Sequence, residues 1–180
     1  RLDGMAAEAR DRIGSRQGDE EIVKALGRYL FVEQAFKGNT RNYYDADNTY
    51  LHRVLERRTG IPISLSTLYL LISKRLGLPV FGIGMPGHFL VRYESDRYQV
   101  FIDCFNAGAF LTERDCGRFL TQAGYGFDEQ YLSKSTNRAI LIRSLRNLVP
   151  IYHKQNDRVR ESRLSRFIKL LECGHTDSRA

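Results

Sequence analysis

An α+β fold is predicted for this chain of 180 residues. Segments with helical periodicity lie between residues 2 and 77 and again between residues 136 and 172, whereas the middle of the chain holds three short segments rich in β-branched and aromatic residues. The length suits one compact domain, and the 42% of apolar residues are enough to bury a core. Helices that are segregated from a small antiparallel sheet are typical of the α+β class.

Two helices and an ordered loop are predicted in the N-terminal part of the chain. The first helix covers residues 2–16 and is amphipathic. The second begins at Asp19, the expected N-cap, carries two glutamates in its first turn, where the helix dipole favours negative charge, and stops near Gly38. Asparagine, aspartate and tyrosine dominate residues 39–48, which predicts a loop.

Two further helices are predicted before the strands. Asn48 or Thr49 caps the first of them, and Gly60 ends it. The other follows Pro62 and is apolar almost all the way round until Lys74, which predicts a buried helix. Proline fits its first turn because the missing N–H has no intrahelical partner there.

Three antiparallel strands are predicted at residues 79–84, 87–94 and 98–103, because glycines or a polar turn separate them. A capping pattern from Thr112 to Asp115 then indicates another helix. A loop is expected between that helix and the C-terminal segment.

Two basic amphipathic helices are predicted at residues 136–153 and 157–172, with a frayed tail after them. Most of the excess positive charge, +7 for the whole chain, lies in this last third. The charges alternate with core-type residues, which favours a solvated helical face over a stripe that binds nucleic acid.

The turn between the second and third strands predicts which residues face each other. A symmetric turn at Ser95 and Asp96 places His88 directly opposite Asp103. Directly opposed residues share a face of the sheet, with Cβ atoms about 4.5–5.5 Å apart, so the imidazole and the carboxylate should hydrogen-bond. Such a pair is two-thirds of a nucleophile–histidine–acid triad, and it is also an ordinary structural pair at a sheet edge; both interpretations stay open.

Three runs of sequence make the chain similar to a known family. GIPISLSTLYLLISKRLGLP (60–79), GMPGHFLVRY (84–93) and FIDCFNAG (101–108) resemble the transglutaminase-like superfamily, in particular its bacterial branch that is associated with tetratricopeptide repeats and invasion regulators. The resemblance covers roughly residues 20–172. It implies a papain-like arrangement in which a buried helix packs on an antiparallel sheet, and it places the superfamily's histidine and acid at His88 and Asp103.

The resemblance breaks at the nucleophile. Catalytic members have Gly-x-Cys at the start of the helix, and a gapless match places that cysteine on Pro62, while shifts of two or four residues place it on Ser64 or Ser66. None of these side chains is a thiol. A backbone cap is favoured for Ser64, and Cys104 should point to the face of its strand opposite His88, where a buried apolar role is favoured.

Two functions of different classes are predicted from these residues. The first is a transglutaminase-like domain that lacks the thiol nucleophile, a pseudoenzyme that works as a binding or scaffolding module through a residual His–Asp cleft. The alternative is a hydrolase or acyl transferase in which Ser64 or Ser66 is the nucleophile, His88 the general base and Asp103 the orienting acid. A protein or peptide partner is expected; a nucleic-acid partner rests on charge alone.

The remaining expectations concern organisation and context. Three regions are expected: an N-terminal helix (1–18), the transglutaminase-like core (19–134), and a C-terminal helical pair with its tail (135–180) that begins a repeat-like region. Three widely spaced cysteines without a C-x-x-C pair indicate a reducing, cytoplasmic compartment. No metal or organic cofactor is expected, and no apolar run approaches the roughly 18–20 residues that would span a bilayer.

Overall fold

The computed structural model describes residues 1–16 and 18–173, and its centre is a five-stranded antiparallel sheet. The strands lie in the order β6-β5-β4-β3-β7, so the three predicted strands are adjacent and two short strands extend them at either edge. The strands have the bounds β3 (Val80–Ile83), β4 (Leu90–Glu94), β5 (Gln99–Asp103), β6 (Ala109–Leu111) and β7 (Lys134–Ser135). The predicted α+β class is confirmed.

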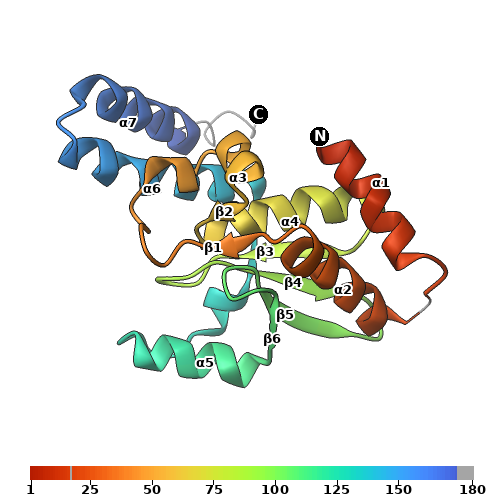
Figure 1. Cartoon of the computed structure of the whole chain (residues 1–180). Helices are drawn as coiled ribbons and strands as arrows, with labels where there is room; N and C mark the ends of the chain where they lie inside the picture. Colours follow the sequence, from red (N-terminus) through yellow and green to blue (C-terminus); the bar gives the residue numbers. More distant parts are fainter. Residues whose placement is uncertain (17, 174–180) are drawn as a thin grey trace, which may run out of the picture.

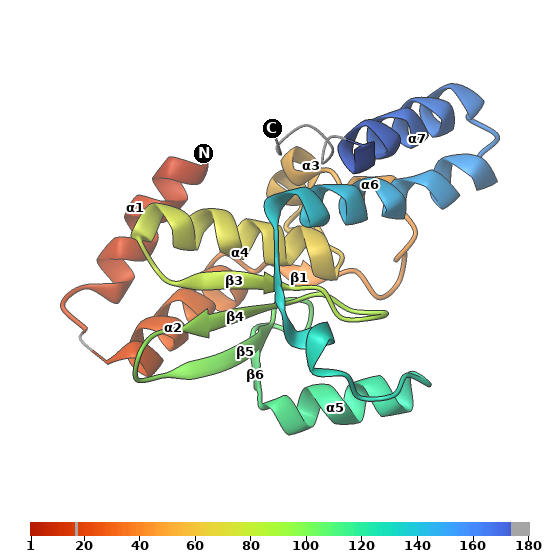
Figure 2. The same cartoon turned by 180° about the vertical axis from the view of Figure 1, so that it is seen from behind.

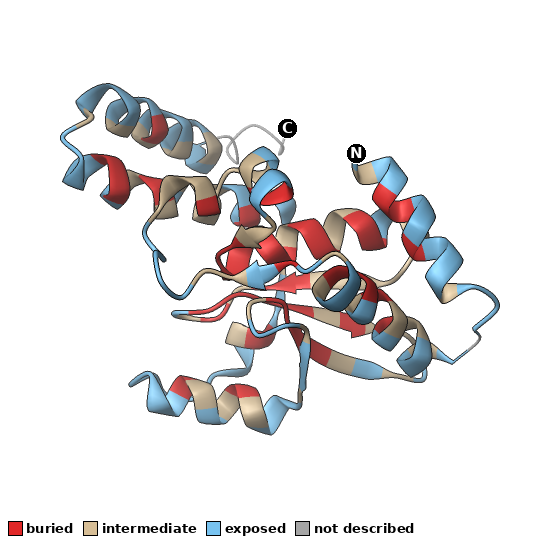
Figure 3. Cartoon of the chain, in the orientation of Figure 1, coloured by how far each residue is buried: buried red, intermediate tan, exposed pale blue. Residues whose placement is uncertain are grey.

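Helices cover the two faces of this sheet differently (Figures 1 and 2). Helix α4 (Pro62–Leu76) packs on one face, on the same side as α2 (Asp19–Gly27), and α1 (Leu2–Ile13) packs against α4; helix α5 (Glu113–Gln122) lies on the other face. The side chains of α4 are buried along most of its length, as its all-round apolar sequence predicts (Figure 3).

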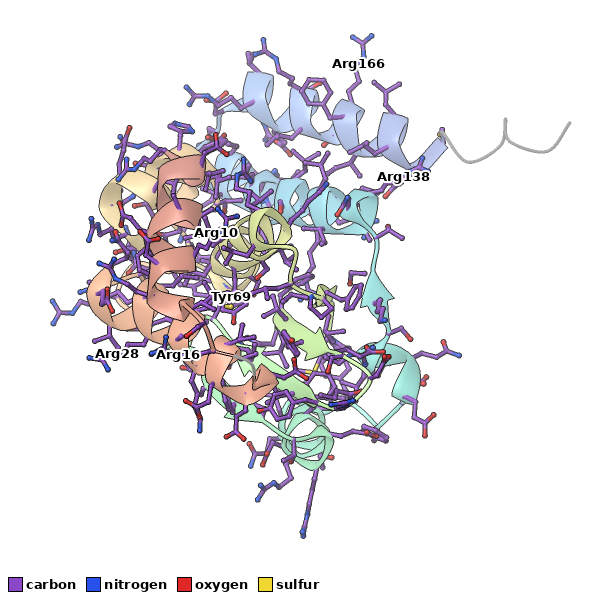
Figure 4. The ribbon with its side chains drawn as sticks, turned by 90° about the vertical axis from the view of Figure 1, so that its right-hand side faces the viewer. Arg10, Arg16, Arg28, Tyr69, Arg138 and Arg166 are labelled. Carbon is purple, nitrogen blue, oxygen red and sulfur yellow. The ribbon has the colours of Figure 1, made fainter. Side chains whose placement is uncertain are left out.

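The main core lies between α4 and the sheet. Tyr69 of α4 is fully buried there beside Val91 and Ile102 of the strands, and Figure 4 shows Tyr69 inside the fold while Arg28 and Arg166 extend outward. Residues of α1 belong to the same cluster, so this helix is packed into the core. A second cluster fills the space between the opposite face of the sheet and α5.

The C-terminal segment forms an antiparallel helical pair at one end of the molecule (Figure 1). Helices α6 (Asn137–Lys154) and α7 (Arg158–Cys173) begin and end within two residues of the predicted bounds. Their contact buries Leu148, Tyr152 and Leu164. The predicted frayed tail lies outside the described residues. None of the described helices is both long and apolar enough to cross a membrane.

Two predicted helix caps are wrong because tertiary contacts use their side chains. Gly18, not Asp19, precedes α2; the Asp19 carboxylate accepts hydrogen bonds from the Tyr93 and Ser95 hydroxyls, both at 2.6 Å. These hydrogen bonds lower the pKa of Asp19. Tyr50 precedes α3 (Leu51–Arg57), while the Asn48 amide donates to backbone carbonyls of the preceding loop.

Short irregular elements also depart from the predicted pattern. The second predicted helix changes after residue 27 into a π-helical segment (Arg28–Glu33). The two-residue strands β1 (Lys37–Gly38) and β2 (Thr59–Gly60) pair in parallel beside the start of α4, and two 3₁₀ segments lie in predicted loops (Ala46–Asn48 and Glu129–Leu132). Segments this short carry no periodicity that a sequence pattern could reveal.

Candidate functional site

The His88 and Asp103 side chains meet in a buried hydrogen bond. The His88 Nε2 atom lies 2.9 Å from Asp103 Oδ2, and the two residues are only 8% and 5% exposed. Asp103 ends β5, whereas His88 lies in the turn that precedes β4, after the sharp bend at Gly87. The hydrogen bond that the sequence predicts is therefore present.

The strand register that predicted this contact is nevertheless wrong by two residues. The turn is wider than expected, with Ser95 N–H donating to the Tyr98 carbonyl, so Glu94 pairs with Gln99. A shift of two residues preserves the alternation of side chains between the faces of a strand. The contact survives because His88 lies beyond the paired part of β4 and reaches the end of β5 from the turn.

Asp103 also organises the loop that follows it. Its Oδ1 atom accepts the backbone N–H groups of Phe105 and Asn106, at 3.0 and 3.2 Å, and Oδ2 accepts the Asn106 side-chain amide at 2.8 Å. Burial alone would raise the pKa of Asp103, but the hydrogen bonds and charge of His88, aided by Asn106, lower it below its usual value. The carboxylate is therefore held ionised among four donors.

Aromatic rings enclose the imidazole. Phe119 of α5 lies 5.2 Å from the centre of the His88 ring and Phe105 lies 6.3 Å from it. Within the described residues, Nδ1 of His88 makes no hydrogen bond, so only one ring nitrogen is engaged. An imidazole oriented in this way could exchange a proton with a group placed at Nδ1.

The Ser64 hydroxyl is engaged by the backbone rather than by the imidazole. Its Oγ accepts the Ile61 N–H at 3.0 Å and donates to the Asn48 carbonyl at 2.5 Å. Ser64 is the third residue of α4, so it is not the N-cap. The N-cap is Ile61, and the Ser64 hydroxyl accepts a hydrogen bond from its N–H. Gly60 allows this packing, since a Cβ there would lie 2.6 Å from Ser64 Oγ.

Ser64→Ala is expected to lower the free energy of unfolding by about 1–2 kcal/mol, because the buried Ile61 N–H and Asn48 carbonyl are left with only their long hydrogen bond to each other, at 3.4 Å. Urea denaturation measures the effect. Ser73→Ala is the matched control: Ser73 is buried on the same helix, yet its hydroxyl has no hydrogen-bond partner among the described residues, so its removal should cost less than about 0.5 kcal/mol. Equal losses in the two variants would contradict the structural role of Ser64.

Ser66 and Cys104 are both buried, and Cys104 belongs to the main core cluster that includes residues of α4 and the strands. Ser66 Oγ donates to the Phe89 carbonyl at 3.3 Å. Both side chains are fully buried, and burial raises the pKa of Cys104 far above its usual value. Neither serine hydroxyl hydrogen-bonds His88 in the described part of the chain.

A pocket lies directly beside the histidine turn. Gly87 and Phe89, the two neighbours of His88, line it together with Arg143 of α6. The basic residues of the C-terminal helices are predicted to lie on a solvated face, but Arg143 is half-buried, and its Nη2 atom donates to the His88 carbonyl at 2.8 Å. Charge alternation gave no signal for this position, because the sequence does not show which basic residues lack an acidic partner.

No group of three or more candidate metal ligands occurs among residues 1–16 and 18–173.

Comparisons with known proteins agree with the arrangement of helix and sheet. A family model described as the transglutaminase-like superfamily matches residues 1–146. A UPF0162 protein of Xylella fastidiosa (strain 9a5c) is 38% identical over 156 residues, which are 83% of this chain and 56% of that protein. F-box only protein 21 of Mus musculus is 41% identical over 118 residues, which are 59% of this chain and 19% of that protein.

A more distant UPF0162 protein, from Vibrio cholerae, is 36% identical over 103 residues, or 57% of this chain and 38% of the relative. The chain thus spans between about a fifth and just over half of the length of these three relatives. No solved structure matches it.

Proposed function

The chain belongs to the transglutaminase-like superfamily, and we propose that it serves there as a non-catalytic module that binds a protein or peptide. The observation that carries this proposal is that the hydroxyls of both candidate serine nucleophiles are hydrogen-bonded to backbone groups. Ser64 Oγ hydrogen-bonds backbone groups at the start of α4, and Ser66 Oγ donates to the Phe89 carbonyl. The imidazole of His88 therefore has an orienting acid, and neither candidate serine hydroxyl hydrogen-bonds it in the described residues.

A structural role accounts for the His–Asp pair under this proposal. Asp103 accepts hydrogen bonds from the loop after β5 and from the turn before β4, so the pair ties these two segments together. Arg143 continues this connection from the histidine turn to α6 through the His88 carbonyl. The histidine turn and α6, which both line the pocket, are thereby held together, which is the rigidity that a binding site needs.

The relatives support a binding role in a different way. One of them is named for an F-box, which suggests a part in protein interactions. The 118 residues shared with that protein are 59% of this chain, so the shared part includes much of the fold described above.

Two activity-based assays test the non-catalytic proposal on the whole chain. A fluorophosphonate probe should label neither Ser64 nor Ser66, and incorporation of a fluorescent amine into a glutamine-containing peptide should not exceed the rate without protein. His88→Gln is the informative variant, because glutamine can still donate a hydrogen bond to Asp103 but cannot act as a general base. Labelling or turnover that is present in the unmodified chain and lost in His88→Gln would overturn the proposal.

A further inference from the structure

The pocket beside the histidine turn has a volume of about 580 Å³ and lies between that turn, Ser135 of β7 and α6. Met85, Phe89 and Ile142 give it apolar walls, while Arg143 and Ser135 bring polar groups to it. A pocket of this size with apolar walls and few polar groups is typical of sites for small ligands or single side chains.

Arg143 is the least compensated charge of the pocket. Its guanidinium donates once, to the His88 carbonyl, and lies over the Phe89 ring at 5.4 Å. Within the described residues it forms no ion pair and its other N–H groups meet no acceptor, although burial is sufficient to lower the pKa of Arg143. The other arginine of the pocket, Arg146, is already paired with Glu172 at 2.6 Å.

A half-buried guanidinium without a counter-charge is costly, since it gives up hydration without gaining an ion pair. The cost falls when an anion enters and accepts the free N–H groups. Arginine is well suited to this, because its planar fork matches the two oxygens of a carboxylate.

The backbone around Arg143 is shaped to leave room for such a group. A Cβ on Gly84 would lie 3.4 Å from Arg143 Nη1 and 3.0 Å from Ser135 Oγ, so the guanidinium and the hydroxyl approach the same point beside the bare glycine. The Ser135 hydroxyl has no hydrogen bond in the part of the chain that the structure describes. Helix α6 begins two residues later, and its N-terminal end adds positive potential here.

We propose that this pocket binds a carboxylate, with Arg143 and Ser135 as its donors and the apolar walls holding the hydrocarbon part of the same residue. One guanidinium and one hydroxyl match a single carboxylate better than a phosphate dianion, which needs more donors and charge. The inference rests on the proposed binding function and names its ligand class: a peptide that presents either a C-terminal carboxylate or an acidic side chain.

Three small probes distinguish the possible sources of the anion. N-acetyl-leucine carries a terminal carboxylate, N-acetyl-Leu-Glu-Leu-amide carries only a side-chain carboxylate, and N-acetyl-leucinamide carries none. NMR titration of the isotope-labelled chain follows the Arg143 Nε–H and the Gly84 amide. We expect saturable shifts with one or both carboxylate probes and none with the amide. Shifts with the amide equal to those with N-acetyl-leucine, or saturation by inorganic phosphate alone, would overturn the proposal.

Two arginine variants complete the test. Arg143→Gln can keep the hydrogen bond to the His88 carbonyl but loses the charge, and it should weaken carboxylate binding by at least about tenfold. Arg146→Gln removes the same charge from the same pocket, but from a guanidinium already paired with Glu172, and it should change the affinity less than about twofold. Equal losses of carboxylate affinity in the two variants would show that only net charge matters and would refute the site, provided that thermal melting shows both variants to be folded. Turnover in the amine-incorporation assay would instead remove the non-catalytic proposal and leave this pocket intact.

Discussion

Asp103→Ala is expected to lower the free energy of unfolding by about 3–5 kcal/mol, the largest effect of any polar substitution near the site. The carboxylate accepts four hydrogen bonds, and its removal leaves the buried His88 Nε2 without its partner and the N–H groups of Phe105 and Asn106 without their acceptor in the turn. Urea denaturation followed by circular dichroism measures the loss.

Two controls make this expectation specific. Asp103→Asn keeps one acceptor oxygen and the side-chain shape, so it should lose about half as much. Asp96→Ala removes an exposed carboxylate from the neighbouring turn and should change the free energy of unfolding by less than about 0.5 kcal/mol. A loss for Asp103→Ala no larger than that for Asp96→Ala would show that the network does not stabilise the fold.

The pH dependence of stability gives an independent readout of the same group. Because the folded state lowers the pKa of Asp103, its charge contributes stability above the unfolded value, near 3.8, and that contribution is lost as the pH falls through the folded value. The unmodified chain should therefore lose more stability between about pH 5 and pH 2 than Asp103→Asn does. Parallel pH profiles for the two proteins would contradict the lowered pKa.

The sequence could predict the histidine–carboxylate contact because side-chain direction in a strand has a period of two. The error in the register was also two residues, so His88 and Asp103 kept their common face although Leu90 no longer pairs with Phe101. A register error of one residue would have separated them. The buried helix after Pro62 was equally accessible to prediction, because an all-round apolar sequence leaves no exposed face.

The parts that could not be predicted depend on which tertiary partner a polar side chain finds. Asp19 has the residue type and position of an N-cap, yet hydroxyls from β4 and the turn after it bind its carboxylate. Arg143 resembles its basic neighbours in sequence, and only the fold shows that it alone lines the histidine turn without an acidic partner in the described residues. Propensity describes what a residue can do, whereas the fold determines which option is used.

Cys173 is expected to be the single cysteine that reacts rapidly with dithionitrobenzoate in the folded protein. It is exposed, whereas Cys104 and Cys116 are fully buried. Burial raises the pKa of Cys116 to about 11, which leaves about 0.03% thiolate at pH 7.5, and it raises the pKa of Cys104 further. The two buried thiols should react at least about a thousandfold more slowly than the exposed one, and all three should react in urea.

This reactivity pattern is the sharpest test of whether thiol chemistry has been lost, because a cysteine nucleophile must be both ionised and accessible. Cys104 is the thiol nearest to Asp103 in the sequence, but it lies in the turn after β5 and is fully buried in the main core cluster. If Cys104 is modified rapidly in the native state, and if His88→Gln suppresses that modification while Cys173 still reacts, then the thiol reaches the imidazole and the non-catalytic proposal fails. If its modification instead follows the rate of global unfolding, the sulfur belongs to the core and the imidazole has no nucleophile to activate.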